Sequence, residues 1–415
     1  MNLIPDLEFR GLIYQATDLD GLAERLAAGP ITLYNGFDPT ADSLTVGNLV
    51  PILLLRRFQL AGHKAIALAG GGTGLIGDPS GKSEERQLNT GDTVAEWTEK
   101  VKGELARFLD FDGPNPAEMV NNYDWLGSVN AIDFMRDIGK HFPISYMLAK
   151  DSVDSRLQSG ISYTEFSYMV LQAYDFLVLN EKYGCELQTG GSDQWGNITA
   201  GTDLIRRAAS NKAFGLTCPL VTKADGTKFG KTEGGTVWLD ADKTSAYQFY
   251  QFWINSEDQK VTDYLKIYTF LERDEILQLE EAVRDAPEKR QAQRTLAAEV
   301  TTLVHGAEAT RKAEKISNAL FYGEFNDLEE DEILDGFHDV PTHKMATERL
   351  GLIDLLVEAR ISSSKREARQ DLQNGSIYIN GERCTDLQHQ LGPQDGLHGK
   401  YLIMRRGKKK YTLVS

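Results

Sequence analysis

Cysteines are few in this sequence, and long hydrophobic runs are absent. Cys185, Cys218 and Cys384 lie far apart and form no CxxC pair, so neither a disulfide framework nor a cysteine-based zinc site is expected, and no metal ligands are assigned. Runs such as LVPILLL are far shorter than the roughly 20 apolar residues that cross a bilayer. The first residues, MNLIPDLEFR, do not resemble a signal peptide. We therefore expect a soluble, cytoplasmic protein.

Positive charge is also scarce, and it is unevenly distributed. The formal net charge of the 415 residues is −16, which argues against a protein that coats nucleic acid over its whole surface. Residues 349–415 hold 12 Lys and Arg against 7 Asp and Glu, so this segment carries +5 and the preceding 348 residues carry −21. A basic module on an acidic body is typical of a protein that binds a polyanion at one end, although an ordinary solvated surface can give the same pattern.

Alternating apolar and helical patterns in residues 1–222 predict an α/β domain with a parallel sheet. A strand, a helix and a second strand are predicted at ITLYNG (31–36), GNLVPILLLRRFQLAG (47–62) and KAIALAG (64–70). This βαβ unit implies a sheet covered by helices, with ligands bound at the carboxyl ends of its strands. Tyr34 and Asp78 fall at or just beyond such ends.

The pattern changes after residue 222. Residues 223–324 hold a glycine-rich segment and then helical periodicity, which predicts an α-helical domain. Residues 325–348 are acidic and weakly periodic, as in a linker. Residues 349–415 show two helix patterns and then a hairpin signal at Asn380-Gly381, which predicts a small α+β domain.

Two glycine motifs suggest nucleotide folds that their surroundings do not support. GTGLIG (72–77) matches GxGxxG, but a polar loop with Pro79 follows it in place of an apolar helix. GDPSGKS (77–83) is one residue too short for a phosphate-binding P-loop. The glycines still allow a backbone to approach a ligand closely. Lys82 and Arg86 lie nearby, either as phosphate ligands or as solvated loop charges.

Three further segments carry polar groups with a chemical use. In the predicted helix 163–179, one face carries Tyr168, Gln172 and Asp175. These side chains could bind a small amphoteric ligand, and a solvated polar stripe is the alternative. GGSDQWGN (190–197) suits polar contacts to a sugar or an amine. In KADGTKFGKTEGG (223–235), glycines and two lysines suit a mobile phosphate clamp, although a basic surface turn is the alternative.

The loop FDPTADSLTVGNL (37–49) contains no cation and leads into the apolar helix that is predicted to begin at Gly47. The first N–H groups of a helix bind anions through their free donors and the helix dipole. The cations that an anionic ligand requires can therefore come from a mobile segment elsewhere in the chain.

Taken in order, these motifs resemble bacterial tyrosyl-tRNA synthetases over essentially the whole chain. FDPTADSLTVGNL is similar to the "HIGH" region of class I aminoacyl-tRNA synthetases, and KFGKT to their "KMSKS" loop. GLIGDPSGKSEER, ISYTEFSYMVLQAYDF and QTGGSDQWGNITAG follow the family in order and spacing. The resemblance implies a Rossmann-like catalytic domain, an α-helical anticodon-recognition domain and a C-terminal S4-like tRNA-binding domain.

The resemblance also implies a reaction. L-tyrosine and ATP, accompanied by Mg²⁺, give tyrosyl-adenylate and pyrophosphate, and the tyrosyl group then passes to the 3′ end of tRNA(Tyr). The tyrosine carboxylate is the nucleophile, so no general base is needed, and positioning and electrostatics carry the chemistry. A homodimer is implied as well. Polar groups that bind the tyrosine hydroxyl discriminate against phenylalanine strongly enough that no editing site is needed, as tyrosyl-tRNA synthetases themselves illustrate.

Roles for individual residues follow from the resemblance. The substrate phenol would be held by Tyr34 and Asp175, and its ammonium group by Asp78, Tyr168 and Gln172. ATP and adenylate binding is implied for Gly36, Asp38, Gly47, Asn48, Gly191, Asp193, Gln194 and Lys231. Stabilisation of the phosphates is implied for Thr40, Thr45, Lys82, Arg86, Lys228, Lys231 and Thr232. Contacts to tRNA are implied for Lys365, Arg366, Arg369, Arg405 and Arg406.

The sequence departs from the family pattern at two positions. Thr45 stands where the first signature usually opens with His, and Asn48 is a known alternative at its fourth position. Thr189 replaces a usually apolar residue. Two other functions stay open: a tryptophanyl-type synthetase, which Tyr34, Asp175 and the basic tail oppose, and a paralogue kept for RNA binding or an unusual tyrosyl product, which only Thr45 favours. Tyrosine-driven ATP–pyrophosphate exchange would distinguish them.

Overall fold

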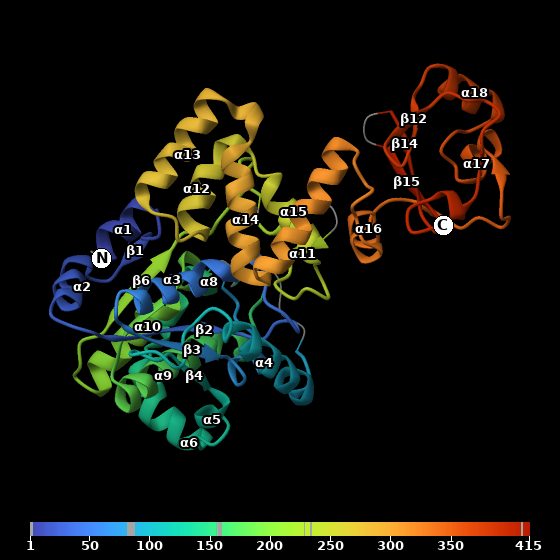
Figure 1. Ribbon diagram of the computed structural model, residues 1–415. Coiled ribbons are helices and arrows are strands. Elements are labelled where there is room, and N and C mark those ends of the chain that lie inside the picture. Colours follow the sequence, from blue (N-terminus) through green and yellow to red (C-terminus); the bar gives the residue numbers. More distant parts are fainter. Residues whose placement is uncertain are drawn as a thin grey trace. The chain divides into compact units, whose positions relative to one another are not determined.

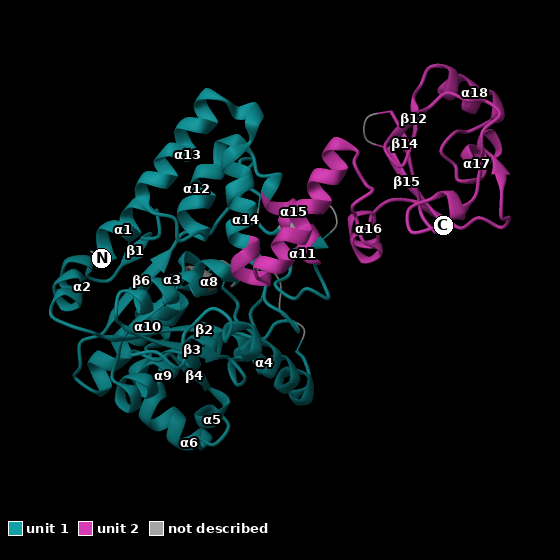
Figure 2. Ribbon diagram, viewed as in Figure 1, with its two compact units in different colours: residues 1–244, 254–300 teal, residues 245–253, 301–415 magenta. Residues whose placement is uncertain are grey.

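The computed structural model describes residues 3–80, 88–154, 156, 160–227, 229–232, 235–407 and 410–415. The chain forms two compact units, shown in Figure 2. Unit 1 comprises Met1–Thr244 and Ile254–Val300, and unit 2 comprises Ser245–Trp253 and Thr301–Ser415. No helix in the described part of the chain is both long and apolar enough to cross a membrane.

A six-stranded sheet forms the centre of unit 1. Its spatial order is β1 (Gln15–Ala16), β6 (Phe214–Cys218), β5 (Cys185–Gly191), β2 (Thr32–Phe37), β3 (Lys64–Ala69) and β4 (Glu118–Asn121). β1 pairs antiparallel at one edge, and all the other neighbours are parallel. β3 is buried and apolar apart from Lys64, and β2 is buried over Leu33–Asn35 and at Phe37, as strands covered on both faces are. The predicted parallel sheet and its βαβ unit are confirmed.

Helices cover this sheet on both sides, with α3 on one side and α9 on the other (Figure 1). The helices up to residue 208 are α1 (Leu3–Phe9), α2 (Leu19–Ala27), α3 (Leu49–Leu60), α4 (Gly91–Leu105), α5 (Tyr123–Leu126), α6 (Ala131–Asp133), α7 (Ile144–Leu148), α8 (Asp151–Asp154), α9 (Tyr163–Tyr183) and α10 (Trp195–Ala208). Short turns of helix are η1 (Val46–Asn48), η2 (Thr73–Leu75), η3 (Phe134–Ile138), η4 (Gly139–His141) and η5 (Ser192–Gln194).

The ends of α9 explain its position. Ser162 caps its first turn by accepting from the Glu165 N–H, and Gly184 ends it in the left-handed region at φ 63°. The helix therefore runs four residues beyond the predicted end at 179. The segment predicted as a helix from Gly47 begins instead as the 3₁₀ turn η1, and α3 follows it.

Unit 1 continues with a small hairpin and a group of helices. These elements are β7 (Lys231–Thr232), β8 (Gly235–Thr236), α12 (Asp258–Tyr268), α13 (Arg273–Asp285), η6 (Pro287–Lys289) and α14 (Gln291–His305), whose last turns belong to unit 2. The predicted helical region after residue 260 is confirmed.

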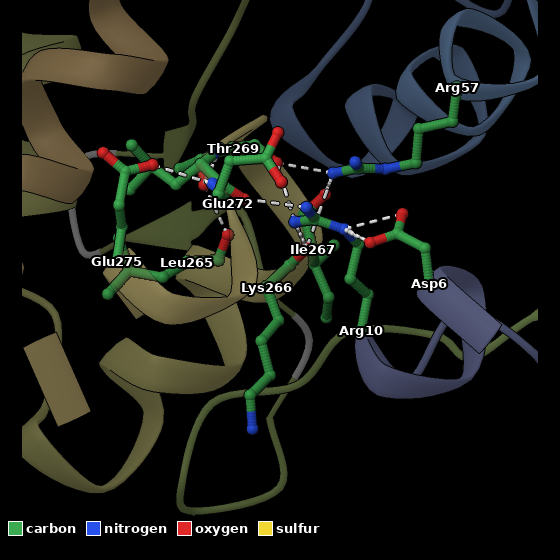
Figure 3. A network of polar contacts seen from close by, with 10 residues as sticks. Asp6, Arg10, Arg57, Leu265, Lys266, Ile267, Thr269, Glu272 and Glu275 are labelled. Carbon is green, nitrogen blue, oxygen red and sulfur yellow. Dashed lines mark hydrogen bonds and ion pairs between the residues drawn. The ribbon is translucent and has the colours of Figure 1, made fainter. Parts of the chain in front are cut away.

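Two buried arginines join α1 and α3 to the end of α12 (Figure 3). Arg10 follows α1, and Arg57 lies on α3 with 4% of its surface exposed. Their guanidinium groups donate to the main-chain carbonyls of Lys266, Ile267, Thr269 and Leu271. Burial, and then repulsion by Arg10, lowers the pKa of Arg57 to about 9, so the group remains protonated at neutral pH. The carbonyls at the negative end of α12 stabilise this charge.

We predict that Arg57→Met lowers the free energy of unfolding of unit 1 by about 3 kcal/mol, because buried carbonyls lose a charged donor. Arg56→Met is the matched control, since Arg56 is the neighbouring arginine and its side chain donates to Gln59 on the same helix. Urea unfolding followed by circular dichroism measures both. Equal midpoints for the two variants would show that the Arg57 contacts contribute nothing.

Unit 2 combines helices with a second sheet. Its helices are α11 (Ala246–Ile254), α15 (Ala307–Tyr322), α16 (Glu330–Gly336), α17 (Leu352–Glu358), η7 (Pro393–Asp395) and α18 (Lys365–Gln373). Its five-stranded sheet has the order β12 (Glu382–Cys384), β11 (Ile377–Ile379), β14 (Leu402–Arg406), β15 (Lys410–Val414) and β9 (Thr342–His343). A separate pair consists of β10 (Leu350–Gly351) and β13 (Gln390–Leu391). Asn380 and Gly381 link β11 to β12 with φ of 49° and 90°, which confirms the predicted hairpin turn.

The segment 325–348 differs from the linker that we expected. It contains α16 and β9, and β9 pairs in parallel with β15. Phe325 and Phe337 are each 1% exposed and belong to one apolar cluster with Ile403 and Leu413. The few apolar residues among the acids therefore bind this segment to the C-terminal sheet, and its many carboxylates obscured that pattern in the sequence.

Candidate active site

The residues expected to bind substrate gather at the carboxyl ends of β2, β3 and β5, together with α9 and the start of α10. β2 supplies Tyr34 and leads into Asp38, and β5 ends at Gly191. α9 presents Tyr168, Gln172 and Asp175. A parallel sheet places these ends at one edge, which is where such folds bind ligands.

The deepest part of the site contains a phenol and a carboxyl group. The Tyr34 hydroxyl is buried and has no hydrogen-bond partner among the residues that the structure describes. Asp175 is 2% exposed and accepts from Trp125 Nε1 at 2.7 Å and from Asn122 Nδ2 at 2.9 Å. Burial raises the pKa of Asp175 to about 8, and burial followed by the charge of Asp175 raises the pKa of Tyr34. A buried donor without a partner indicates that a ligand supplies one.

Further out, several carboxylates surround Tyr168. Its hydroxyl donates to Asp38 Oδ2 at 2.6 Å, and Asp38 Oδ1 accepts from Thr73 Oγ1 at 2.6 Å. The pKa of Tyr168 is raised well above its usual value by burial and by the charges of Asp38, Asp78 and Asp175. The carboxylates of Asp38 and Asp78 suit an ammonium group.

Amide side chains connect α9 to the start of α10. Asn197 Nδ2 donates to Gln172 Oε1 at 3.1 Å and to Gln194 Oε1 at 3.2 Å. Gln194 Nε2 in turn donates to Asp78 Oδ2 at 2.5 Å. The structure therefore brings the predicted residues Asp78, Gln172 and Gln194 together, and Asn197 is the member that sequence reasoning missed.

Two further residues of the site, Thr189 and Gly70, have structural explanations. Thr189, on β5, accepts from Asn35 Nδ2 and donates to the Tyr34 carbonyl, each at 3.2 Å, so its hydroxyl joins β5 to β2. At Gly70, a Cβ atom would lie 1.9 Å from Asp38 Oδ1. Glycine at the end of β3 therefore allows the Asp38 carboxylate to reach Tyr168.

The first signature loop ends at η1. Asn48 Oδ1 accepts both from the Thr45 N–H at 2.9 Å and from its hydroxyl at 3.0 Å. The hydroxyl of Thr45 is thus engaged within the turn. Thr40 lines a cavity of about 160 Å³ together with Asp38, Pro39, Gly74, Gly77, Leu88 and Asn89. Gly36 and Gly47 lie in β2 and η1, where an added Cβ would meet only ordinary contacts.

Several predicted phosphate ligands cannot be placed. Lys82, Arg86 and Lys228 lie outside the described residues, as do the side chains of Lys231 and Thr232. The backbone of the last two forms β7, which pairs with β8. Phe229, in the same segment, packs against the rings of Tyr264 and Tyr268 on α12, at centroid distances of 4.5 and 5.7 Å.

The predicted tRNA contacts separate into two groups. Lys365, Arg366 and Arg369 lie on α18. Arg405 stacks over the Tyr378 ring at 3.9 Å. Arg406 donates to Glu367 and Asp371 and so joins β14 to α18 within the domain. Its guanidinium therefore has a structural role within the domain that the sequence did not show, and a contact of Arg406 to tRNA remains a prediction.

Other polar residues of the site were missed. Asn122 and Trp125 hold Asp175, and both occur in NNYDW (121–125), immediately after β4. A polar cluster at the end of a parallel strand marks a ligand site, but the sequence pattern predicts no strand at 118–121.

The chain matches known families along nearly its whole length. Residues 26–322 match the model described as tRNA synthetases class I (W and Y), and residues 332–414 match the tyrosine–tRNA ligase SYY-like C-terminal domain. Tyrosine–tRNA ligase 1 of Bacillus subtilis is 60% identical over 100% of this chain and 99% of its own, and the Bacillus velezensis enzyme is equally similar.

Solved structures agree with these matches. A truncated mitochondrial tyrosyl-tRNA synthetase of Aspergillus nidulans is 30% identical, with a TM-score of 0.71 over 77% of this chain and 94% of that one. A Plasmodium falciparum tryptophanyl-tRNA synthetase, 13% identical with a TM-score of 0.54 over 80% of this chain and 87% of that one, shows the shared fold alone.

The chain belongs to the class I tRNA synthetases of the tryptophan and tyrosine family. Within that class, its full-length similarity places it with the tyrosine–tRNA ligases, which confirms the resemblance seen in the motifs. It is therefore an enzyme, a ligase that forms aminoacyl-tRNA.

The raised pKa of Asp175 gives a prediction about pH. Its folded-state pKa is about 8, against 3.8 without the protein environment, so the folded protein binds this proton more tightly than the unfolded chain. Wild-type stability should fall as pH rises from about 4 to about 8, where the buried carboxyl loses its proton. Asp175→Asn does not titrate, so its stability relative to wild type should increase over that range. Thermal unfolding across pH measures this, and a constant difference would contradict the buried proton.

Proposed function

We propose that this enzyme activates L-tyrosine with ATP at the site at the end of the sheet and transfers it to tRNA(Tyr). The buried Tyr34 hydroxyl, which has no described partner and lies near Asp175, carries this proposal. A substrate phenol supplies the missing partner. Phenylalanine would leave the Tyr34 hydroxyl without a partner and would offer no hydroxyl to Asp175, and that cost is the basis of selection.

The ammonium group of tyrosine would bind among Asp78, Tyr168 and Gln172. Its carboxylate would then point toward the mouth formed by η1, where ATP binds. Gly36, Asp38, Gly191, Asp193 and Gln194 would line the nucleotide, with Gly47 and Asn48 at the helix mouth. The carboxylate attacks the α-phosphorus of ATP, and pyrophosphate leaves with the electron pair of the broken P–O bond. The residues orient the reactants, and no protein base is required.

The departing phosphates would be stabilised from two sides. Thr40 and Thr45 approach from the first signature loop, and Lys82, Arg86, Lys228, Lys231 and Thr232 are the proposed ligands from the two glycine-rich segments. Mg²⁺ enters with ATP as part of the substrate, bound by the phosphates. Fixed positive charge at the place where negative charge develops is the expected source of rate acceleration.

The roles of the domains follow the same proposal. Residues 1–222 carry the activation chemistry, residues 223–324 read the anticodon region, and residues 349–415 bind tRNA in the cytoplasm. Basic residues on α18 support the last role, because Lys and Arg are the usual phosphate contacts.

The test of function is amino-acid selection in ATP–pyrophosphate exchange. Tyrosine should drive exchange by the wild-type enzyme. Tyr34→Phe and Asp175→Asn should each lower discrimination against phenylalanine by tenfold to about a hundredfold, because a buried partner of the hydroxyl is lost. Tyr174→Phe is the matched control, since it removes a phenol from α9, the helix that carries Asp175. Unchanged discrimination in both pocket variants would refute the assigned roles.

The role of the tail is best tested without truncation, because Ile403 and Leu413 pack against the rest of unit 2. We predict two effects of the triple variant Lys365→Gln, Arg366→Gln and Arg369→Gln. The rate of tRNA charging should fall and tRNA binding should depend less steeply on salt concentration, while tyrosine-driven exchange should be unchanged. Lys212→Gln, an exposed lysine in unit 1, is the control. Charging at the wild-type rate by the triple variant would exclude a tRNA role for α18.

A homodimer is the proposed assembly. Six large apolar residues between 123 and 163 are 37–71% exposed: Tyr123, Ile132, Met135, Ile144, Leu148 and Tyr163. Monomers rarely expose such a concentration of apolar surface, and a second copy of the same chain is its most common partner. Ile132→Asp with Met135→Asp should convert a dimer to a monomer in light scattering, whereas Leu60→Asp should not. Wild-type protein that is monomeric at micromolar concentration would contradict this interface.

A further inference from the structure

Glu104 is one of several buried carboxylates outside the substrate pocket. Glu104 is on α4 and is only 4% exposed, between the buried side chains of Val101 and Leu105. Burial raises its pKa, and hydrogen bonds from Leu44 and Ser43 oppose that rise. A carboxylate in such surroundings costs stability, so its contacts require an explanation beyond folding.

Both oxygens of Glu104 hold the first signature loop. Oε1 accepts from Ser43 Oγ, and Oε2 accepts from the Leu44 N–H, each at 2.7 Å. Ser43 is itself 4% exposed. These two residues immediately precede Thr45, the residue that opens η1.

The same stretch is joined to the segment that follows the second signature. The Leu239 N–H donates to the Leu44 carbonyl at 2.9 Å, and the Asp240 N–H donates to Ser43 Oγ at 3.3 Å. The Val46 N–H donates to the Val237 carbonyl at 3.2 Å.

This connection reaches the second signature itself. The Val237 N–H donates to the carbonyl of Gly230, in KFGKT, at 3.0 Å. Residues 43–46, residues 237–240 and Gly230 therefore form one hydrogen-bonded assembly, and Glu104 holds it from the side of α4.

We propose that Glu104 is a positioning residue that fixes the two signature segments relative to each other at the phosphate end of the site. The inference rests on the proposed function. A carboxylate suits this role because it presents two acceptors to two donors, whereas glutamine presents one acceptor and one donor. Asp42 adds surface ion pairs to Lys243 at 2.5 Å and to Lys100 at 3.8 Å beside the same connection.

The experiment is single-turnover adenylate formation by Glu104→Gln, with tyrosine binding at equilibrium measured separately. We expect the rate constant to fall about tenfold or the KM for ATP to rise by a similar factor, since glutamine keeps only one of the two acceptors and the other hydrogen bond is lost or reversed. Tyrosine affinity should change less than about twofold, because the tyrosine pocket does not touch Glu104. The melting temperature should not fall, because glutamine removes a buried charge.

Two further variants make the result specific. Glu99→Gln is the matched control, since Glu99 lies on α4 with its side chain 70% exposed, and it should behave as wild type. Ser43→Ala should slow adenylate formation, and the Ser43→Ala/Glu104→Gln double variant should be less impaired than the product of the single effects, because both changes act on one hydrogen bond.

Three outcomes would overturn the inference. A wild-type rate and KM for ATP in Glu104→Gln would show that the contact does not position the loop. Tyrosine affinity and melting temperature falling together with the rate would show a general structural role. Multiplicative effects in the double variant would separate Glu104 from Ser43. By contrast, wild-type enzyme without tyrosine-driven exchange would refute the proposed function itself.

Discussion

A buried phenol hydroxyl that has no hydrogen-bond partner among the described residues governs the organisation of this site. Tyr34 lies in the central strand β2, buried beside Phe176, with its ring centroid 5.3 Å from that of Phe176. The cost of burying an unsatisfied hydroxyl is about 1–3 kcal/mol, which a ligand hydroxyl would recover. The neighbouring Asp175 is fixed by Asn122 and Trp125. A rigid polar pair in an apolar pocket can therefore recognise one atom of its ligand.

The remaining polar groups form successive layers outward from that pair. Asp38 and Asp78 give the middle of the site a negative charge; Asp38 accepts from Tyr168, and amide side chains of α9, η5 and α10 lead to Asp78. Beyond lie the turn η1 and the two signature segments. The described part of this region offers backbone groups at the helix mouth, and the side chains of the proposed lysine and arginine ligands lie outside the described residues. Such a gradient suits a zwitterionic amino acid whose ammonium group lies inside and whose carboxylate faces a phosphate.

Much of this arrangement could be predicted from the sequence. The spacing of Tyr168, Gln172 and Asp175 predicts that they share one face of a helix. The predicted strand 31–36 places Tyr34 near the carboxyl end of the sheet. Both could be predicted because helical and strand periods are local properties. Their partners could not be predicted. Tyr168 donates to Asp38, which is 130 positions away in the chain, and only the fold decides such pairs.

The failures have similar causes. The segment 325–348 looked like a linker because it is acidic and only weakly periodic, yet Phe325 and Phe337 are buried in an apolar cluster. The intradomain role of Arg406 was likewise missed, because its partners Glu367 and Asp371 could not be identified from the sequence. In both cases a few long-range contacts overrode the local composition. Glu104 gave no signal at all, since a single acid on an amphipathic helix normally faces solvent.

The most direct test is a crystal structure of the enzyme with a non-hydrolysable tyrosyl-adenylate analogue. The phenol oxygen of the analogue should lie within about 3 Å of both the Tyr34 hydroxyl and an Asp175 oxygen, the usual distance of an O–H···O hydrogen bond. Its phosphate should lie at the mouth formed by η1. A phenol bound elsewhere, with Tyr34 and Asp175 hydrogen-bonded to each other, would contradict the proposed recognition of the substrate hydroxyl.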